Sequence, residues 1–450
     1  MSLEGRRIRH PKYGEGKVVS KIGGAFLLLV KFDNGITFYV RRDECRFLEP
    51  KPRVETPPTI TTESLKISLS GSPNISAASF LETLRLGIVP NNVSEFTFGR
   101  ESELDRVESW TRQDDSPPLL IVGDYGSGKS HLLECVKDRY LKRGWVISSF
   151  QLDPNECPLH RPKRVYSKII RTMKILKDGE ELGFRDLMKG YADLKSDAIG
   201  QDYLDLVLGV CRHRHTSTDY VWDWIEGTGP ISCYAGLPLY DDAPSANIYC
   251  SILSGIATLA RKSGFQGFLI MLDEAEQISG SWYAPYQFLK GLDFFAGLAI
   301  TSSASDLLIE EPQINDDPPP TLIGPKSRLP YSARKPIHYC RSGSSPFKVI
   351  FAFSDIQSLQ GLVYQRLGNP LVVHLRPLGD KAKKEILKSL YETYTHAYPN
   401  FNYDCIDELV VDIMSLRKYM ENVRMLIKAF IEALDIVRYY SMKSHRSFLF

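Results

Sequence analysis

The chain has 450 residues, enough for two or three structural units with sizeable hydrophobic cores. Its 56 basic side chains nearly balance 54 acidic ones, which gives a formal net charge of +2. This charge excludes a strong overall electrostatic attraction to nucleic acid or to an anionic membrane. The eight cysteines are scattered without a Cys-x-x-Cys pair and no apolar run is long enough to cross a bilayer, so we expect reduced thiols and a soluble, cytoplasmic protein without membrane contact.

Residues 1–50 predict a small β-barrel built from short strands. The dipeptide Asn34-Gly35 lies between two apolar segments, which is a strong signal for a hairpin turn. Basic side chains are frequent in this module and suit contacts with the phosphates of DNA, and the alternative is a solvated face on a protein-docking barrel. The basic residues are Arg6, Arg7, Arg9, Lys12, Lys17, Arg41, Arg42 and Arg46.

The next segment, residues 51–77, is rich in Pro, Thr and Ser and has no apolar period, which predicts a flexible linker. Order resumes with a short helix expected over residues 79–87 and closed by Gly and Pro. A turn at Gly99-Arg100 then opens a second helix that reaches Trp110.

A phosphate-binding loop follows the apolar run of residues 119–122, where a predicted strand enters Gly-x-x-x-x-Gly-Lys-Ser and an amphipathic helix. Glycines let backbone N–H groups approach phosphate oxygens, and the helix N-terminus favours anions. We expect Lys129 to contact the β- and γ-phosphates of ATP and Ser130 to bind Mg²⁺. The preceding segment often covers adenine in such ATPases, so Arg100 and Glu101 are candidate contacts. The predicted nucleotide-binding residues of the loop are Gly123, Asp124, Tyr125, Gly126, Ser127, Gly128, Lys129, Ser130 and His131.

A second apolar run, residues 268–272, ends in two acidic residues and predicts a buried parallel strand. Asp273 is expected to hold Mg²⁺, and Glu274 to polarise the attacking water as a general base. A further apolar strand over residues 347–353 ends at Ser354, which we expect near the γ-phosphate or the water. These residues predict ATP hydrolysis on an α/β core with a parallel sheet.

The C-terminal part predicts a helix over residues 356–367 and a strand over residues 371–375, followed only by helices. Arg366 ends the first of these helices, where AAA+ ATPases place an arginine finger that reaches a neighbouring subunit; a surface arginine is the alternative. The later helices predict a lid, for which Arg417 and Arg424 are the candidate sensor-2 arginines. The lid helices are expected over residues 382–394, 405–414 and 417–439.

Two other stretches have weaker patterns. Residues 307–346 contain clustered prolines and acids without an apolar period, which predicts a disordered insertion. Cys211, His213 and His215 are of the types that bind zinc, but no second cluster completes a tetrahedral site, so the end of a basic helix is the preferred interpretation. The predicted domains are a barrel (1–50), a linker (51–77), an α/β core (78–376) and a helical lid (377–450).

Six segments together resemble the BrxC/BrxD ATP-binding family, P-loop proteins of bacterial and archaeal phage-defence (BREX) loci. The segments are 84–90, 98–101, 123–131, 157–161, 272–276 and 364–367, in family order. The resemblance implies an AAA+, ORC-like ATPase in an anti-phage or DNA-transaction complex, with a helicase partner and homo-oligomeric assembly. It supports roles for Lys129, Ser130, Asp273, Glu274 and Arg366. The N-terminal module resembles the SH3/Tudor-like modules of UvrD-type helicases, which implies docking to nucleic acid or RNA polymerase.

Three functions remain open on these motifs. The first is ATP hydrolysis that drives assembly or remodelling on DNA, and the second is a nucleotide-gated switch with little turnover that docks a helicase or nuclease. Glu274 and Arg366 favour the first, because a switch needs neither a base nor a finger. Asp273-Glu-Ala-Glu276 mimics a helicase motif, but an autonomous helicase needs two RecA-like cores and only helices are predicted after residue 375.

Overall fold

The structure, a computed structural model, divides into two compact units, residues 1–69 and 70–450. It describes residues 6–11, 14–22, 27–33, 35, 37–41, 45–47, 74–90, 93–114, 116–195, 197–213, 219–231, 237–279, 283–303, 337, 339–340, 346–354, 364, 366–416 and 422–440. Outside these ranges lie residues 51–73 of the linker predicted over 51–77, most of the predicted insertion, residues 356–363 of the helix expected over 356–367, His215 and Arg417.

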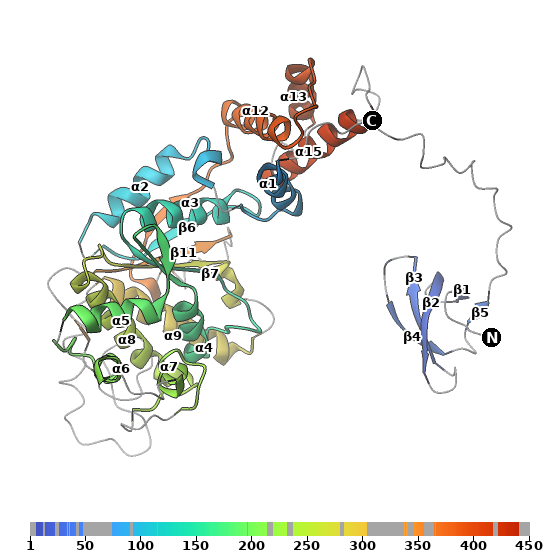
Figure 1. The fold of residues 1–450 in the computed structure, drawn as a ribbon. Coiled ribbons are helices and arrows are strands. Elements are labelled where there is room, and N and C mark those ends of the chain that lie inside the picture. Colours follow the sequence, from blue (N-terminus) through green and yellow to red (C-terminus); the bar gives the residue numbers. More distant parts are fainter. Residues whose placement is uncertain are drawn as a thin grey trace. The chain divides into compact units, whose positions relative to one another are not determined.

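The smaller unit is an antiparallel sheet of five strands in the order β4-β3-β2-β1-β5 (Figure 1). The strands are β1 (Arg7–His10), β2 (Gly14–Ile22), β3 (Leu27–Phe32), β4 (Thr37–Arg41) and β5 (Arg46–Phe47). The hairpin predicted at Gly35 is confirmed, since β3 pairs with β4 and Gly35 has a φ of 87°. Ile8, Val30 and Phe32 belong to its small core. Among the described strands, no pairing closes the sheet into the expected barrel.

The larger unit contains a mostly parallel sheet in the order β12-β6-β11-β10-β7-β8-β9. Its parallel strands are β6 (Leu119–Val122), β7 (Val146–Gln151), β10 (Phe268–Asp273), β11 (Phe347–Phe353) and β12 (Leu371–His374). The strands expected at β6, β10, β11 and β12 are confirmed. Two short antiparallel strands, β8 (Met173–Lys177) and β9 (Glu180–Leu182), extend the β7 edge.

Helices cover both faces of this sheet, because alternate strand residues point to opposite sides (Figure 1). On one face, α2 (Glu101–Thr111) and α3 (Lys129–Lys142) share a core with Leu119, Ile121 and Leu269. On the other face, further helices pack against Leu120, Ile270 and Phe351. These helices are α4 (Pro162–Arg171), α5 (Phe184–Leu194), α6 (Asp202–His213), α7 (Asp219–Ile225), α8 (Ala246–Lys262) and α9 (Pro285–Ser302). Ile337, within the predicted insertion, is buried in the same core.

A separate helical core is built from α12 (Asp380–Ala397), α13 (Ile406–Ser415) and α15 (Val423–Tyr440). The N-terminal helix α1 (Ile75–Leu86) joins it, because Leu81 and Leu84 pack with Leu387 and Leu434. Arg85 also donates to Asp435 across 2.6 Å. The helix that we expected at the start of the α/β core therefore packs with the C-terminal helices. We call these four helices the lid.

None of the described helices combines the length and the apolar character needed to span a membrane.

Candidate nucleotide-binding site

The phosphate-binding loop leaves the end of β6 and returns as α3. Gly123 continues the sheet by donating its N–H to Phe353 O at 3.2 Å. Gly126 and Gly128 have φ values of 82° and 98°, a region that side-chain-bearing residues rarely adopt. Gly128 is the N-cap of α3, so the predicted helix begins at Lys129, inside the motif. The loop thus ends at a helix N-terminus, where unpaired N–H groups and the helix dipole favour an anion.

Lys129 and Ser354, predicted from segments far apart in the chain, meet at this loop. The lysine side chain is 8% exposed, and its Nζ donates to Gly123 O at 2.7 Å and Asp124 O at 3.2 Å. Its third contact is Ser354 Oγ, at 3.2 Å. Ser354 follows the end of β11, which is the strand next to β6. The ammonium group is held by neutral oxygens, which a phosphate oxygen can replace with a stronger, charge-assisted bond.

Ser130 and Asp273, which were each expected to bind Mg²⁺, lie next to each other. The Ser130 hydroxyl donates to Asp273 Oδ2 at 2.6 Å. Burial raises the pKa of the Asp273 carboxyl, while the Ser130 hydrogen bond acts in the opposite direction. A hydroxyl and a carboxylate beside a phosphate site are the hard oxygen ligands that Mg²⁺ prefers. The residues present therefore fit this cation.

Two glutamates follow Asp273 in a tight turn. Glu274 has a left-handed φ of 51°, its N–H donates to Asp273 Oδ1 at 2.9 Å, and Gln277 Nε2 lies 3.3 Å from its Oε2. Glu276 accepts hydrogen bonds from both the backbone N–H of Ser354, at 3.1 Å, and its hydroxyl. Glu276 was not predicted as a site residue. The only sequence signal for Glu276 was its position three residues after Asp273. Its contact with Ser354 depends on the turn between Asp273 and Glu276, which sequence spacing does not reveal.

A cavity of about 180 Å³ opens beside the loop. Its polar end contains Lys129, Ser130, Asp273, Glu274 and Ser354. The opposite wall is largely apolar and comes from the lid, η2 (Val93–Phe96) and the segments next to them. This wall includes Leu84, Ile88, Phe96, Phe98, Leu378 and Ile427. A charged end joined to an apolar wall suits a triphosphate attached to a base.

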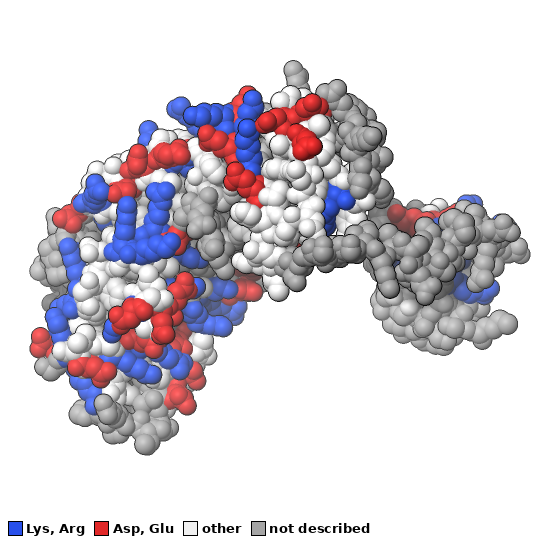
Figure 2. Space-filling model, turned by 45° about the horizontal axis from the view of Figure 1, so that its top comes forward, with Lys and Arg blue, Asp and Glu red and all other residues white. Residues whose placement is uncertain are grey.

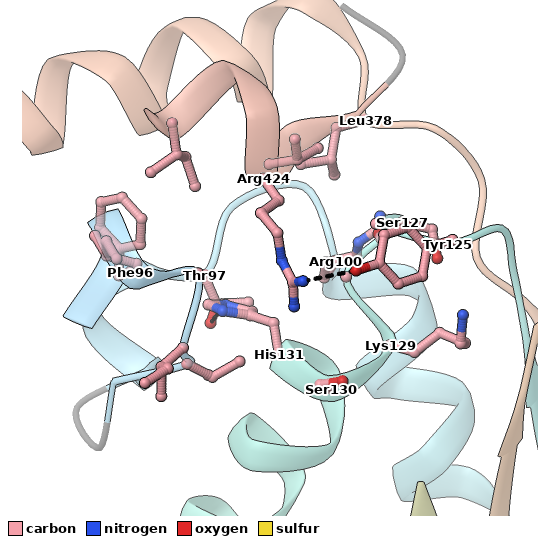
Figure 3. A pocket seen from close by; sticks show the side chains of 18 of the residues that line it. Phe96, Thr97, Arg100, Tyr125, Ser127, Lys129, Ser130, His131, Leu378 and Arg424 are labelled. Atoms are coloured by element: carbon pink, nitrogen blue, oxygen red, sulfur yellow. Dashed lines mark hydrogen bonds between the residues drawn. The ribbon is translucent and has the colours of Figure 1, made fainter. Parts of the chain in front are cut away.

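The lid touches the phosphate-binding loop through the first turn of α15. Arg424 Nη1 donates to the Tyr125 hydroxyl at 3.0 Å, and the guanidinium points into the cavity (Figure 3). Asn422 accepts from the N–H groups of Arg424 and Met425 at 3.0 and 3.3 Å, as an N-cap does. The same amide covers Gly126, where an added Cβ would lie 2.4 Å from Asn422 Nδ2. Of the two sensor-2 candidates, Arg424 lines the cavity.

Arg100 lines the cavity but is engaged by protein atoms. It is 5% exposed and donates to Ser127 O at 2.7 Å, Arg376 O at 2.8 Å and Glu103 Oε1 at 2.8 Å. It therefore ties the phosphate-binding loop to the connection between β12 and α12. Direct contact of Arg100 with a nucleotide stays a prediction.

Arg366 lies apart from the residues that line this cavity. Its Nη1 is 3.4 Å from Asp293 Oδ1 on α9. A finger that serves a neighbouring subunit need not face its own cavity, so this position neither requires nor opposes that role.

Two arginines of the N-terminal module are already paired with acids. Arg7 contacts Glu15 and Asp33, and Arg9 contacts Glu15. The Asp33 hydrogen bond raises the pKa of Arg7, and the Arg9 hydrogen bond lowers the pKa of Glu15. On the face of the larger unit that Figure 2 shows, basic and acidic side chains are likewise interspersed. Phosphate contacts through Arg7 and Arg9 would compete with these ion pairs.

Residues 73–201 match the family model described as BREX system ATP-binding protein BrxC/D. Among curated proteins, none matches this sequence. Similar solved structures include DnaA from Aquifex aeolicus bound to AMPPCP, at 13% identity and a TM-score of 0.34, with 79% of this chain and 67% of that chain covered. Orc1 from Aeropyrum pernix in complex with DNA has 14% identity and a TM-score of 0.32, with 79% and 64% covered. Drosophila ORC bound to DNA has 12% identity and a TM-score of 0.33, with 88% and 67% covered.

Proposed function

We propose that the chain is a Mg²⁺-dependent ATPase of the BrxC/BrxD type with an AAA+-like core and lid. The observation that carries this proposal is the convergence of Lys129, Ser130, Asp273, Glu274 and Ser354 at the carboxyl ends of β6, β10 and β11, beside a cavity with an apolar wall. Bound Mg²⁺ would neutralise charge on the phosphates. The other roles belong to the chain itself.

Lys129 exchanges its contacts with Gly123 O and Ser354 Oγ for phosphate oxygens. Ser130 and Asp273 would hold the cation through the two oxygens that hydrogen-bond to each other here. Glu274 accepts a proton from the attacking water, for which its carboxylate must turn away from Gln277. Ser354, fixed by Glu276, aligns the water or the γ-phosphate. Arg424 acts as the sensor-2 arginine.

We assign the chain to an anti-phage or DNA-transaction complex in the cytoplasm, where it works with a helicase and assembles as a homo-oligomer. The family-model match to residues 73–201 supports the defence context. The seven described cysteines are free, which suits a reducing compartment. In this assembly Arg366 serves the site of a neighbouring subunit, and the N-terminal module closes into a small barrel that docks on DNA or protein.

A nucleotide-gated switch is the second candidate. The contacts of Asn422 with Gly126 and of Arg424 with Tyr125 join the lid directly to the phosphate-binding loop. ATP that changes the loop would change the lid with or without fast hydrolysis.

Calorimetric ATP binding and ATP turnover of the full chain test these functions, with and without double-stranded DNA at two salt concentrations and with oligomeric state recorded. We expect Mg²⁺-ATP binding that Lys129→Ala abolishes, and turnover that DNA stimulates in a salt-sensitive way. Lys142→Ala is the matched control, because that lysine lies on the same helix and pairs with Asp138. Unaltered affinity in Lys129→Ala would refute the P-loop assignment, and tight binding without turnover would favour the switch.

A further inference from the structure

Tyr125 is an aromatic residue inside the phosphate-binding loop that burial does not explain. It is 72% exposed, so packing in a core does not account for its position. Its hydroxyl accepts the hydrogen bond from Arg424 Nη1 at 3.0 Å, and the centre of its ring lies 5.6 Å from the guanidinium carbon. Both contacts of the phenol therefore involve one side chain, the arginine in the first turn of α15.

Arg424 differs from the other arginine of the cavity in the partners of its charge. Of the described residues, the arginine and lysine side chains that line the cavity are Arg100, Lys129 and Arg424. Arg100 pairs with the carboxylate of Glu103 at 2.8 Å. Lys129 is held by neutral oxygens, and the described partner of the Arg424 guanidinium is the neutral phenol. A phosphate that enters the cavity would therefore meet two cations, Lys129 and Arg424, whose partners in this structure carry no charge.

The side chain of Arg424 is confined at both ends. Its stem lies beside Gly87, the C-cap of α1, where an added Cβ would be 3.3 Å from Arg424 Cδ. Its guanidinium points into the cavity and meets Tyr125 there (Figure 3). A guanidinium carries five N–H donors, so Nη1 can stay on the phenol while other N–H groups face a ligand. A long side chain that is already held in place loses less conformational freedom when the ligand binds.

We propose that Tyr125 is a positioning residue: its hydroxyl holds the Arg424 guanidinium at the cavity, so that the other N–H groups of the arginine bind a phosphate of the nucleoside triphosphate. The inference rests on the proposed ATP site and deepens it. Tyr125 acts through Arg424 and does not itself contact the nucleotide. The phosphate-binding loop and the lid then contribute together to one phosphate contact.

Equilibrium binding of Mg²⁺-ATP to the full chain tests this role in a double-mutant cycle. Tyr125→Phe keeps the ring and removes the hydroxyl, so the nucleotide must itself order Arg424, and we expect about three- to tenfold weaker binding. Arg424→Ala should weaken binding about tenfold or more, because a charge-assisted hydrogen bond to phosphate is lost. In the Arg424→Ala background, Tyr125→Phe should change the affinity by less than about twofold, since the side chain through which it acts is absent.

Tyr286→Phe is the matched control, because Tyr286 is 65% exposed on α9 and is not among the residues that line the cavity. It should bind ATP as the wild-type chain does. The urea-unfolding midpoint of Tyr125→Phe without nucleotide should equal that of the wild-type chain, because the exposed ring is retained.

Four results separate the alternatives. Unaltered ATP affinity in Tyr125→Phe, with or without a lower unfolding midpoint, would make the hydrogen bond a merely structural contact and overturn the proposal. Equal losses from Tyr125→Phe in the two backgrounds would mean that the hydroxyl contacts the nucleotide directly, which also overturns it. Tighter ATP binding in Tyr125→Phe would show that the phenol holds Arg424 back, with the same consequence. Absence of ATP binding to the wild-type chain would instead refute the proposed function.

Discussion

Replacing Gly126 with alanine tests whether the lid rests on the phosphate-binding loop. The new methyl group acts in two ways. The alanine must adopt a backbone φ of 82°, and its Cβ would lie 2.4 Å from Asn422 Nδ2. Asn422 cannot move freely, because its Oδ1 caps the first turn of α15.

The two effects have separate magnitudes. A left-handed conformation costs a non-glycine residue about 1–2 kcal/mol, and loss of an N-cap costs about 1 kcal/mol. We therefore expect Gly126→Ala to lower the free energy of unfolding by about 2–3 kcal/mol. Gly144→Ala is the matched control, because Gly144 has a φ of 77° with no atom within 4 Å of an added Cβ. Gly144→Ala should lower the free energy of unfolding only by the cost of the left-handed conformation.

Urea unfolding followed by tryptophan fluorescence measures these changes in the larger unit, since all five tryptophans lie after residue 100. The double variant Gly126→Ala with Asn422→Ala should be no less stable than Gly126→Ala alone, because the cap is lost in both. Equal losses for Gly126→Ala and Gly144→Ala, or additive losses in the double variant, would refute the contact between lid and loop.

Four further outcomes follow from the site. Glu274→Gln should bind Mg²⁺-ATP but lose at least about a hundredfold in phosphate release, and normal release would place the base elsewhere. Arg366→Ala mixed with Lys129→Ala should recover turnover if the finger acts between subunits, and complete failure argues against it. The free energy of unfolding should fall by up to about 3 kcal/mol as pH drops from 6.5 toward 4, because unfolded His131 takes a proton that the folded ring, with a pKa of about 4, does not; His131→Asn should remove this loss. Deleting residues 1–50 should leave basal turnover intact, and its collapse would contradict an independent N-terminal module.

The sequence predicted those parts of the fold that local pattern determines. The runs at β6, β10 and β11 were recognisable because all their residues except Asp273 and Lys348 are apolar, as strands buried on both faces require. The phosphate-binding loop was recognisable because its glycines, lysine and serine all lie between Gly123 and Ser130 at fixed spacing. The antiparallel strands β8 and β9 were not predicted, since Met173–Leu182 mixes charged and apolar residues over a short length.

Contacts between distant segments were beyond the sequence pattern. Amphipathic periodicity continued from residue 417 to 439, so it did not show where the last helix begins. The structure begins α15 at Val423, which puts Arg424 in the first turn, facing Tyr125. Asn422 was a usable signal for that start, because asparagine is a preferred N-cap.

The lid is tied to the core at the site itself. The chain passes between lid and core in two connections, one from α1 to α2 and one from β12 to α12. Arg100 belongs to the α1–α2 connection and donates to Arg376 O in the β12–α12 connection. Its other guanidinium nitrogen holds Ser127 O of the phosphate-binding loop. Arg85 and Asp435 also join α1 to α15, which are the first and the last lid helices in the sequence. A shift of the loop would therefore act on both connections at once, which is the coupling that the proposed motor or switch would require.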